Sequence, residues 1–478
     1  MYYTKTRAAR AKRKGKITLS DFSPGMDTAV DEELLPLPRC AESFNFDYSG
    51  GVLKDGEGIK TARFGANGTC PSFEVPKVLP LAVFYYKKYD VSEQKNYNYF
   101  LIYGSDGKMY SALTEHSLFT VVNGLTFENV PKATAYNYDG EDVLVFSDGA
   151  TMKIYDGTKV VAVSDVPAIT SMCIHNERLF VTESKNKTSL WFSDDFDPTN
   201  WKISLDQAGF INLVGGGNLL KVVSFGGYLY VFAEYAVFRV IAYADQTQFS
   251  AEKIVASAGR IFENTVTPCG DRIIYLAEDG FYAFSGGAPQ RILKRLDNAL
   301  TGKPDKTCKG NYYNGKYYCL IDLETIEGTE RVMLVYDIRS ATFNLMRNLC
   351  VSDFILADGE DGSELLFLVR DKSRICTLSK KAELCSIPLV KRWISGKTDL
   401  NVGTEKTITK VSLSTSGAID VFLKSEAGSR LLHFSGGNKE QTVPVGLRGN
   451  TFKIEIQSVV PCSRISGVKI SYEYYAEG

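Results

Sequence analysis

The sequence is poor in the residues and motifs that most often carry out chemistry in enzymes. It contains three histidines, His116, His175 and His433, which lie far apart in the chain. Histidine is the usual general base and a common metal ligand, because its charge changes near neutral pH. The GxSxG, HExxH and P-loop motifs are absent. We therefore expect surface or hydrogen-bonded core histidines, no enzymatic activity, no cofactor and no metal.

The chain also lacks a long hydrophobic run and a cysteine motif. No stretch is apolar for long enough to span a membrane, and the basic start of the chain is followed by "ITLSDFSPGMD" rather than by an apolar segment. The ten cysteines include no CxxC pair and no zinc-type spacing with histidine. We expect a protein that is neither inserted in a membrane nor exported, with reduced structural thiols.

The chain has no excess of charge of either sign, because 55 basic and 56 acidic residues give a formal net charge of −1. A near-neutral chain argues against a general nucleic-acid-binding surface. Residues 1–20 are the exception, since they contain seven basic residues and no acidic one: Lys5, Arg7, Arg10, Lys12, Arg13, Lys14 and Lys16. We expect a basic N-terminal arm that either orders on a neighbouring subunit or contacts the DNA backbone.

Aromatic residues and glycine are abundant, with 27 Tyr, 27 Phe and 41 Gly. Many short strands and tight turns produce such a composition. From about residue 78 onward one pattern recurs: an apolar, aromatic strand, a turn, and a second strand with an aromatic residue near its start. Three of the turns contain Asp-Gly, at 106–107, 148–149 and 279–280, which is typical of a type I′ hairpin.

The hairpin centres fall near residues 106, 148, 185, 234, 279, 326 and 371. This spacing is typical of the four-stranded blades of a β-propeller. We predict an all-β chain with a propeller over residues 21–388, of six to eight blades and most simply seven. The early strands at 43–64 can pair with the last blade and close the ring. A β-sandwich or a β-helix is the rival interpretation of this region.

A change in composition near residues 387–395 predicts a second domain. Beyond this point the alternation of apolar and polar residues becomes cleaner, and seven or eight strands fit into about 90 residues. We predict a small antiparallel β-sandwich or jelly roll over residues 389–478.

The segment "SLWFSDDFDPTNW" at residues 189–201 is the one acidic motif that invites a chemical role. A sialidase-type Asp-box is a poor fit, because no glycine follows Asp195. Asp194, Asp195 and Asp197 offer oxygen ligands for a structural cation such as calcium, without the glycine and closing acid of an EF-hand loop. The third interpretation is an architectural turn, in which Asp197 caps Pro198-Thr199-Asn200 and the tryptophans pack on strands.

Two segments resemble the β-propeller tail proteins of tailed bacteriophages. In residues 21–62 the likeness lies in Asn45-Phe46-Asp47, in Gly50-Gly51-Val52-Leu53 and in Gly56 to Lys60. In residues 175–242 it lies in an Arg-Leu-Phe strand, a Trp-Phe-Ser-Asp strand, an Asp-Pro-x-x-Trp turn and a glycine-rich loop. The segment "KRWISGKTDL" also looks like the start of the last domain of such proteins.

The resemblance implies a structural virion protein of the tail or neck, similar to the nozzle of short-tailed phages. Such a protein forms an oligomeric ring, usually six-fold, around the channel for genome ejection. Its partners would be further copies of itself and other tail, neck, portal or adaptor proteins, with transient DNA contact in the channel. It would be assembled in the host cytoplasm.

Two other roles compete with this one. The first is a carbohydrate-binding adhesion propeller with a lectin-like C-terminal domain, in which exposed Tyr and Trp would stack on sugars. The second is a bacterial scaffold propeller that binds proteins.

Overall fold

The computed structural model describes residues 11–64, 68–114, 116, 118–204, 207–243, 245–300, 307–359, 362–370, 374–461 and 463–475. Their regular structure consists of strands and three short 3₁₀ helices, η1 (Gln246–Gln248), η2 (Glu263–Thr265) and η3 (Lys294–Ala299). The all-β prediction is therefore confirmed.

Six successive stretches of the chain each fold into a four-stranded antiparallel sheet with its strands in sequence order. The first three sheets are β6 (Pro80–Asp90), β7 (Lys95–Gly104), β8 (Lys108–Leu113) and β9 (Thr120–Thr126); β10 (Lys132–Tyr138), β11 (Glu141–Ser147), β12 (Met152–Tyr155) and β13 (Val160–Val163); and β14 (Ile169–His175), β15 (Arg178–Glu183), β16 (Ser189–Phe192) and β17 (Gly209–Asn212). The next three are β18 (Leu219–Phe225), β19 (Tyr228–Ala233), β20 (Ala236–Ile241) and β21 (Ser250–Ala256); β22 (Thr267–Cys269), β23 (Arg272–Ala277), β24 (Gly280–Phe284) and β25 (Gln290–Ile292); and β26 (Lys309–Tyr313), β27 (Lys316–Thr325), β28 (Gly328–Asp337) and β29 (Thr342–Arg347).

A seventh sheet combines strands from distant parts of the chain. Its strands β30 (Val351–Gly359), β31 (Gly362–Val369) and β32 (Arg374–Ser379) are followed in the sheet by β5 (Gly58–Thr61), which pairs antiparallel with β32. Two short strands, β33 (Glu383–Leu384) and β34 (Ile387–Pro388), extend it. The strand β5 lies within the early segment 43–64 that was expected to pair with the last blade.

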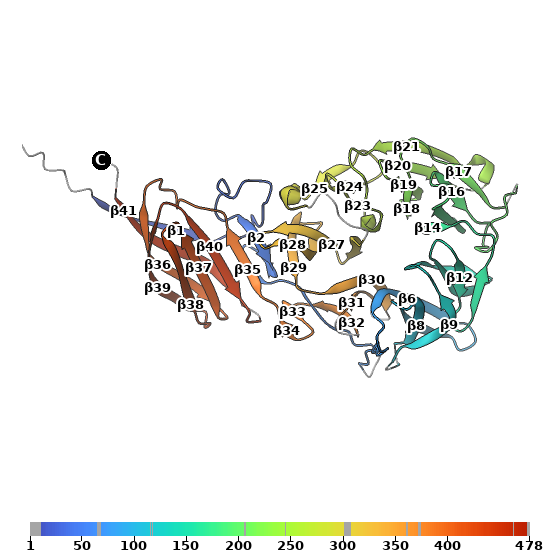
Figure 1. Cartoon of the computed structure of the whole chain (residues 1–478), viewed down its shortest axis with the longest axis horizontal. Coiled ribbons are helices and arrows are strands. Elements are labelled where there is room, and N and C mark those ends of the chain that lie inside the picture. The colour runs from blue at the N-terminus through green and yellow to red at the C-terminus, as the bar shows by residue number, and fades with distance from the viewer. Residues whose placement is uncertain are drawn as a thin grey trace, which may run out of the picture.

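The seven sheets follow one another around a ring (Figure 1). Buried side chains fill the space between each sheet and the next. For example, Leu101 packs in one cluster with Leu144 of the second sheet. The seventh sheet packs on the first in the same way, since Leu366 and Leu368 share a cluster with Phe100. The sheets are thus joined by apolar packing all the way round, as a propeller requires.

Each predicted hairpin joins the second and third strands of one sheet, but the turns differ from the prediction. A type I′ turn needs a positive φ at both central residues. Gly107, Gly149 and Gly280 have positive φ, whereas the aspartate before each does not. The Asp148 carboxylate instead accepts a hydrogen bond from the backbone N–H of Thr151 at 2.8 Å. The type I′ prediction was wrong because an aspartate that accepts from the following backbone does not need a left-handed conformation.

The C-terminal part of the chain forms two further sheets that pack face to face in a β-sandwich-like arrangement. One contains β1 (Lys12–Leu19), β41 (Ile465–Tyr475), β36 (Lys406–Thr415) and β39 (Glu440–Gly449), in that order. The other contains β2 (Cys40–Phe44), β35 (Lys391–Ser395), β40 (Phe452–Ser458), β37 (Ile419–Ser425) and β38 (Gly428–Phe434). Ile470 and Val411 of the first sheet share a buried cluster with Ile454 and Val421 of the second.

The N-terminal segment belongs to this lobe before the chain enters the ring. Strand β1 pairs with β41 over eight residues, from Lys12 opposite Tyr475 to Leu19 opposite Val468. Strand β2 pairs with β35. The expected division into an arm over residues 1–20 and a propeller from residue 21 did not foresee these pairings, because the partners lie at opposite ends of the chain, as Phe44 and Arg392 or Lys12 and Tyr475 do.

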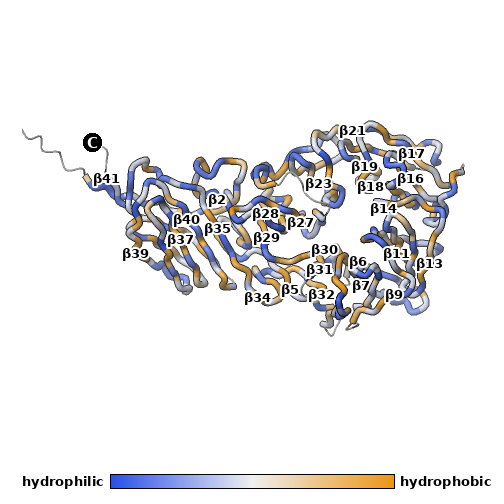
Figure 2. The backbone as a smooth tube through the Cα atoms, in the orientation of Figure 1, coloured by the Kyte–Doolittle hydropathy of each residue, from blue (hydrophilic) through white to orange (hydrophobic). Residues whose placement is uncertain are grey.

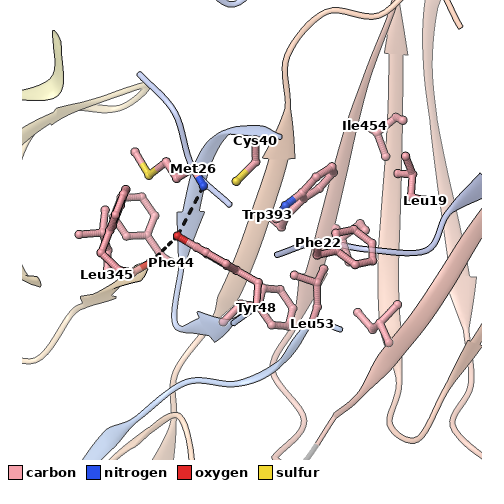
Figure 3. Close-up of a cluster of buried hydrophobic side chains, with 14 of the residues drawn as sticks. Leu19, Phe22, Met26, Cys40, Phe44, Tyr48, Leu53, Leu345, Trp393 and Ile454 are labelled. Carbon is pink, nitrogen blue, oxygen red and sulfur yellow. Dashed lines mark hydrogen bonds between the residues drawn. The ribbon is translucent and has the colours of Figure 1, made fainter. Parts of the chain in front are cut away.

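One buried cluster joins the two lobes (Figure 3). The Tyr48 hydroxyl donates to the backbone carbonyl of Phe343 at 2.5 Å, so the segment that leaves β2 is fixed to strand β29 of the ring. A two-stranded ribbon of β3 (Phe46–Asp47) and β4 (Lys54–Asp55) lies in the same region. Phe22 meets Trp393 edge to face, with ring centroids 5.4 Å apart. The core of the second lobe is therefore continuous with the core of the sixth sheet.

Hydrophobic residues are spread over the strands of both lobes (Figure 2). Among the residues that the structure describes, no helix is long and apolar enough to cross a membrane.

Candidate functional site

The acidic turn after β16 is built from its own side chains. The Asp194 carboxylate accepts from the Asn200 side chain at 2.8 Å. The Asp197 carboxylate accepts from the backbone N–H and the hydroxyl of Thr199, at 2.8 Å and 2.6 Å. Both groups are thus directed into the loop, as in the architectural interpretation. Within the described ranges, no group of three or more His, Cys, Asp or Glu is arranged to hold a metal ion.

Asp195, the third carboxylate, forms an ion pair with Arg178. The Arg178 side chain is 5% exposed and enters from β15. It donates to the backbone carbonyls of Ser193 and Gln207, at 2.8 Å and 2.7 Å. Its guanidinium also lies over the Phe192 ring, 5.5 Å from the centroid. Arg178 therefore fastens both ends of the β16–β17 connection, a role that no sequence spacing indicated.

The two tryptophans of this motif have different surroundings. Trp201 is buried, and its indole N–H donates to the carbonyl of Pro198 at 2.9 Å, which closes the Asp-Pro-x-x-Trp turn. Trp191 lies on β16, is half-buried, and stacks at a tilt on Phe210 with centroids 5.0 Å apart. Its indole N–H donates to the carboxylate of Glu183 at 2.8 Å.

The basic residues of the expected arm are divided between two regions. Lys5, Arg7 and Arg10 lie outside the described residues. Lys12, Arg13, Lys14 and Lys16 are exposed on β1, which is an edge strand of its sheet. Lys12 pairs with Glu473 on β41, and the hydrogen bond from Lys12 is the main reason why the pKa of Glu473 is lowered. The structure therefore places this half of the basic stretch on a sheet edge.

The three histidines are not brought together. His175 is buried on β14, and its Nδ1 lies 2.8 Å from the Ser224 hydroxyl. Burial lowers the pKa of His175, so the neutral ring is favoured. His433 lies on β38, beside Asp420 at 2.9 Å, and is exposed. His116 is exposed between β8 and β9.

The triple glycine at 214–218 is a close-packed loop. Gly215 and Gly217 have positive φ, and a Cβ on Gly216 would lie 2.7 Å from that of Ala236. The Glu234 carboxylate accepts from the backbone N–H of Asn218 at 3.1 Å. Glycine is needed here for packing and backbone conformation, in a strand-to-strand connection rather than at a helix N-terminus.

Three lysines on the first strands of alternate sheets form a basic group that sequence analysis did not identify. Lys132 on β10 donates to the side chain of Asn264 at 3.0 Å, although Asn264 lies in η2 before the fifth sheet. Lys309 on β26 pairs with Asp353 of the seventh sheet at 2.6 Å. Burial lowers the pKa of Lys221 on β18 to about 8, and the charges of Lys132 and Lys309 contribute to this. The first strands therefore face one another, and their lysines repel.

The contact between the two lobes is also held by charged groups. Lys391 and Asp55 are both buried, with side-chain exposures of 1% and 6%, and their charged atoms are 2.5 Å apart. Arg392 on β35 pairs with Glu455 at 2.8 Å and with Glu327 of the sixth-sheet hairpin at 2.5 Å. The Lys391–Asp55 pair is desolvated and needs a fixed geometry, because separating its members would leave a buried charge without its partner, whereas Glu327 is 48% exposed.

Comparisons with known proteins identify no family for this chain. No family model matches the chain, and no curated protein sequence matches it. Among solved structures, it is similar to BBS1N from a complex with ARL6DN, at 10% identity and a TM-score of 0.43, over 69% of this chain and 97% of that chain. It is also similar to the extracellular domain of the putative hybrid two component system BT4673 from B. thetaiotaomicron, at 11% identity and a TM-score of 0.45, over 81% of this chain and 47% of that one. A third is PorZ of Porphyromonas gingivalis, at 13% identity and a TM-score of 0.40, over 77% of this chain and 46% of that one.

Proposed function

We propose that this chain is a non-catalytic structural subunit of a bacteriophage tail or neck, which forms part of an oligomeric ring around the genome-ejection channel. In this proposal the seven sheets are the blades of one seven-bladed propeller, which β5 closes. The C-terminal sheets form a β-sandwich that receives the start of the chain. The residue patterns in 21–62 and 175–242 support the assignment to tail proteins.

The observation that carries an assembly role is the open, basic edge of β1. A sheet edge presents unpaired backbone N–H and C=O groups that can bind another chain. On its other side β1 has no neighbour among the described strands, and Arg13 and Lys16 are exposed on it. Such an edge is protected from indiscriminate pairing by its lysines and arginine, so that only a partner with complementary charge gains from contact.

The firm junction between the lobes supports the same role. A subunit that transmits position from one neighbour to the next has to be rigid, and here the second lobe shares both a core and ion pairs with the sixth sheet. The near-neutral charge of the whole chain suits a wall along which DNA passes, because it offers little attraction to phosphate.

Charge reversal on β1 tests the role in assembly. We expect Arg13→Glu/Lys16→Glu to leave the monomer folded and to reduce its binding to the portal–adaptor complex of the same phage at least tenfold. The matched control is Arg430→Glu/Lys439→Glu, which makes the same charge change at exposed positions on and beside β38. Binding is measured by mass photometry and sedimentation. Equal binding by both double variants would show that β1 is not part of the assembly surface.

A further inference from the structure

A pocket of about 360 Å³ lies at one end of the third sheet, next to the acidic turn. It is formed by the β13–β14 connection, by the hairpin between β15 and β16, and by the β16–β17 connection. Its lining includes both tryptophans of the motif, Trp191 and Trp201, together with Glu183, Lys185 and Asp165. The volume is at the lower end of the range for small-molecule sites, about 300–1,000 Å³.

The aromatic part of the pocket has a fixed orientation. Trp191 is held by its stacking on Phe210 and by its hydrogen bond to Glu183, and Trp201 is held by its bond to Pro198. Because these side chains are already ordered in the free protein, binding a ligand costs no further side-chain entropy for them. A rigid indole surface that lines a pocket is suited to a ligand with one flat apolar face.

The polar part of the pocket contains a carboxylate, Glu183, that can accept a further hydrogen bond. Glu183 is 6% exposed, and one of its oxygens accepts from Trp191. Among the described residues, its other oxygen accepts no hydrogen bond, and Glu183 forms no ion pair. This second oxygen is not among the fully buried, unpaired side-chain atoms, so it is accessible and can accept from the hydroxyl group of a ligand. Lys185, exposed at the rim, can donate to a second hydroxyl.

We propose that this pocket binds a saccharide, with the apolar face of one pyranose ring on Trp191 and its hydroxyls on Glu183 and Lys185. A pyranose ring presents an apolar face of C–H groups and hydroxyls around its edge. These groups are complementary to an indole surface that lies beside a carboxylate and an ammonium group. The pocket is formed by one chain alone, so this proposal does not depend on the proposed ring. In a virion protein it would add a contact with surface glycans.

The test is titration of the purified full-length chain with the methyl glycosides of glucose, galactose, mannose and N-acetylglucosamine. Tryptophan fluorescence and saturation-transfer NMR report binding. We expect at least one glycoside to bind with a Kd in the millimolar range, as a ligand with few atoms should, and to shift the Trp191 emission.

Three variants locate the site. Glu183→Gln keeps an acceptor for the Trp191 indole and removes the charge, and we expect it to weaken binding about tenfold. Lys185→Ala changes an exposed residue and should weaken binding several-fold, whereas Lys439→Ala, exposed in the second lobe, should have no effect. The absence of binding by all four glycosides at 100 mM would overturn the proposal, as would binding that Glu183→Gln and Lys185→Ala leave unchanged.

Discussion

Arg178 holds the acidic segment at residues 189–201 in its observed conformation. The three aspartates of this segment were recognisable from the sequence, and so was the turn that Asp197 caps. Arg178 was not, because its contacts to Ser193 and Gln207 depend on how a loop folds back rather than on a spacing in the chain. Glu183 was missed for the same reason, since its pairing with Trp191 crosses between strands.

We expect Arg178→Met to lower the free energy of unfolding by about 3 kcal/mol, because it leaves the Ser193 and Gln207 carbonyls without a donor and Asp195 without its ion-pair partner. Asp195→Asn should cost less than about 1 kcal/mol, since the Asp195 side chain is 54% exposed. Urea unfolding of both variants measures the difference. A larger loss for Asp195→Asn would contradict the role given to Arg178.

Lys221 gives a pH-dependent prediction. Its pKa is lowered to about 8 in the folded chain by burial and by Lys132 and Lys309, while Cys173 and Glu263 act in the opposite direction. Below about pH 8 the lysine is charged in both the folded and the unfolded chain. In the folded chain this charge is destabilising, because the side chain is buried near two other lysines. Between about pH 8 and the usual lysine pKa the unfolded state holds more protons, so the stability of the wild-type chain rises with pH.

Lys221→Met should therefore be more stable than the wild type at pH 7 by about 1–2 kcal/mol. Its advantage should shrink as the pH rises from 8 to above 10. Paired denaturation curves across this range provide the measurement. An advantage that stays constant with pH would mean that the lysine charge is not disfavoured in the fold.

Among the elements, the hairpins were the most predictable and the N-terminal strands the least. Each of the seven hairpins is a local structure whose apolar alternation and turn residues lie within about twenty positions. The pairings of β1 with β41 and of β2 with β35 are set by which apolar faces remain uncovered once the sheets have formed. No local pattern contains that information.

The place of β5 in the seventh sheet brings one glycine close to the neighbouring backbone. A Cβ on Gly58 would lie 2.2 Å from the carbonyl oxygen of Lys381 and 2.4 Å from the backbone of Glu383. We expect Gly58→Ala to lower the free energy of unfolding by about 1–3 kcal/mol through overpacking. Gly50→Ala is the matched control, because a Cβ there meets nothing within 4 Å. Similar unfolding midpoints for the two variants would show that the seventh sheet does not need the close approach of β5.

Deletion of residues 1–19 tests whether β1 is part of the second lobe. The deletion removes the strand that pairs with β41, together with Leu19, whose side chain is 2% exposed. We expect faster hydrogen exchange for the amides of Ile465–Tyr475 and a loss of about 2–4 kcal/mol in the stability of this lobe. Deletion of residues 1–10 leaves β1 in place and should keep these amides protected. Equal protection in both deletions would mean that β1 is a dispensable edge.

At the scale of the whole molecule, two lobes share one core. The ring was predictable because its repeats recur along the chain, and the second lobe because its composition changes near residue 390. Their junction was not, because it combines Phe22, Tyr48 and Trp393 from regions that the sequence keeps far apart (Figure 3). Under the proposed function, the shared core would hold the two lobes together while the basic edge of β1 contacts a neighbouring chain.

The most direct test of the proposed role is electron cryomicroscopy of the particles that contain this chain. The account predicts copies of the two-lobed subunit in a closed ring around the tail or neck channel, with β1 at the contact with a neighbouring chain. Particles that lack the chain, or that carry single copies away from the channel, would contradict it.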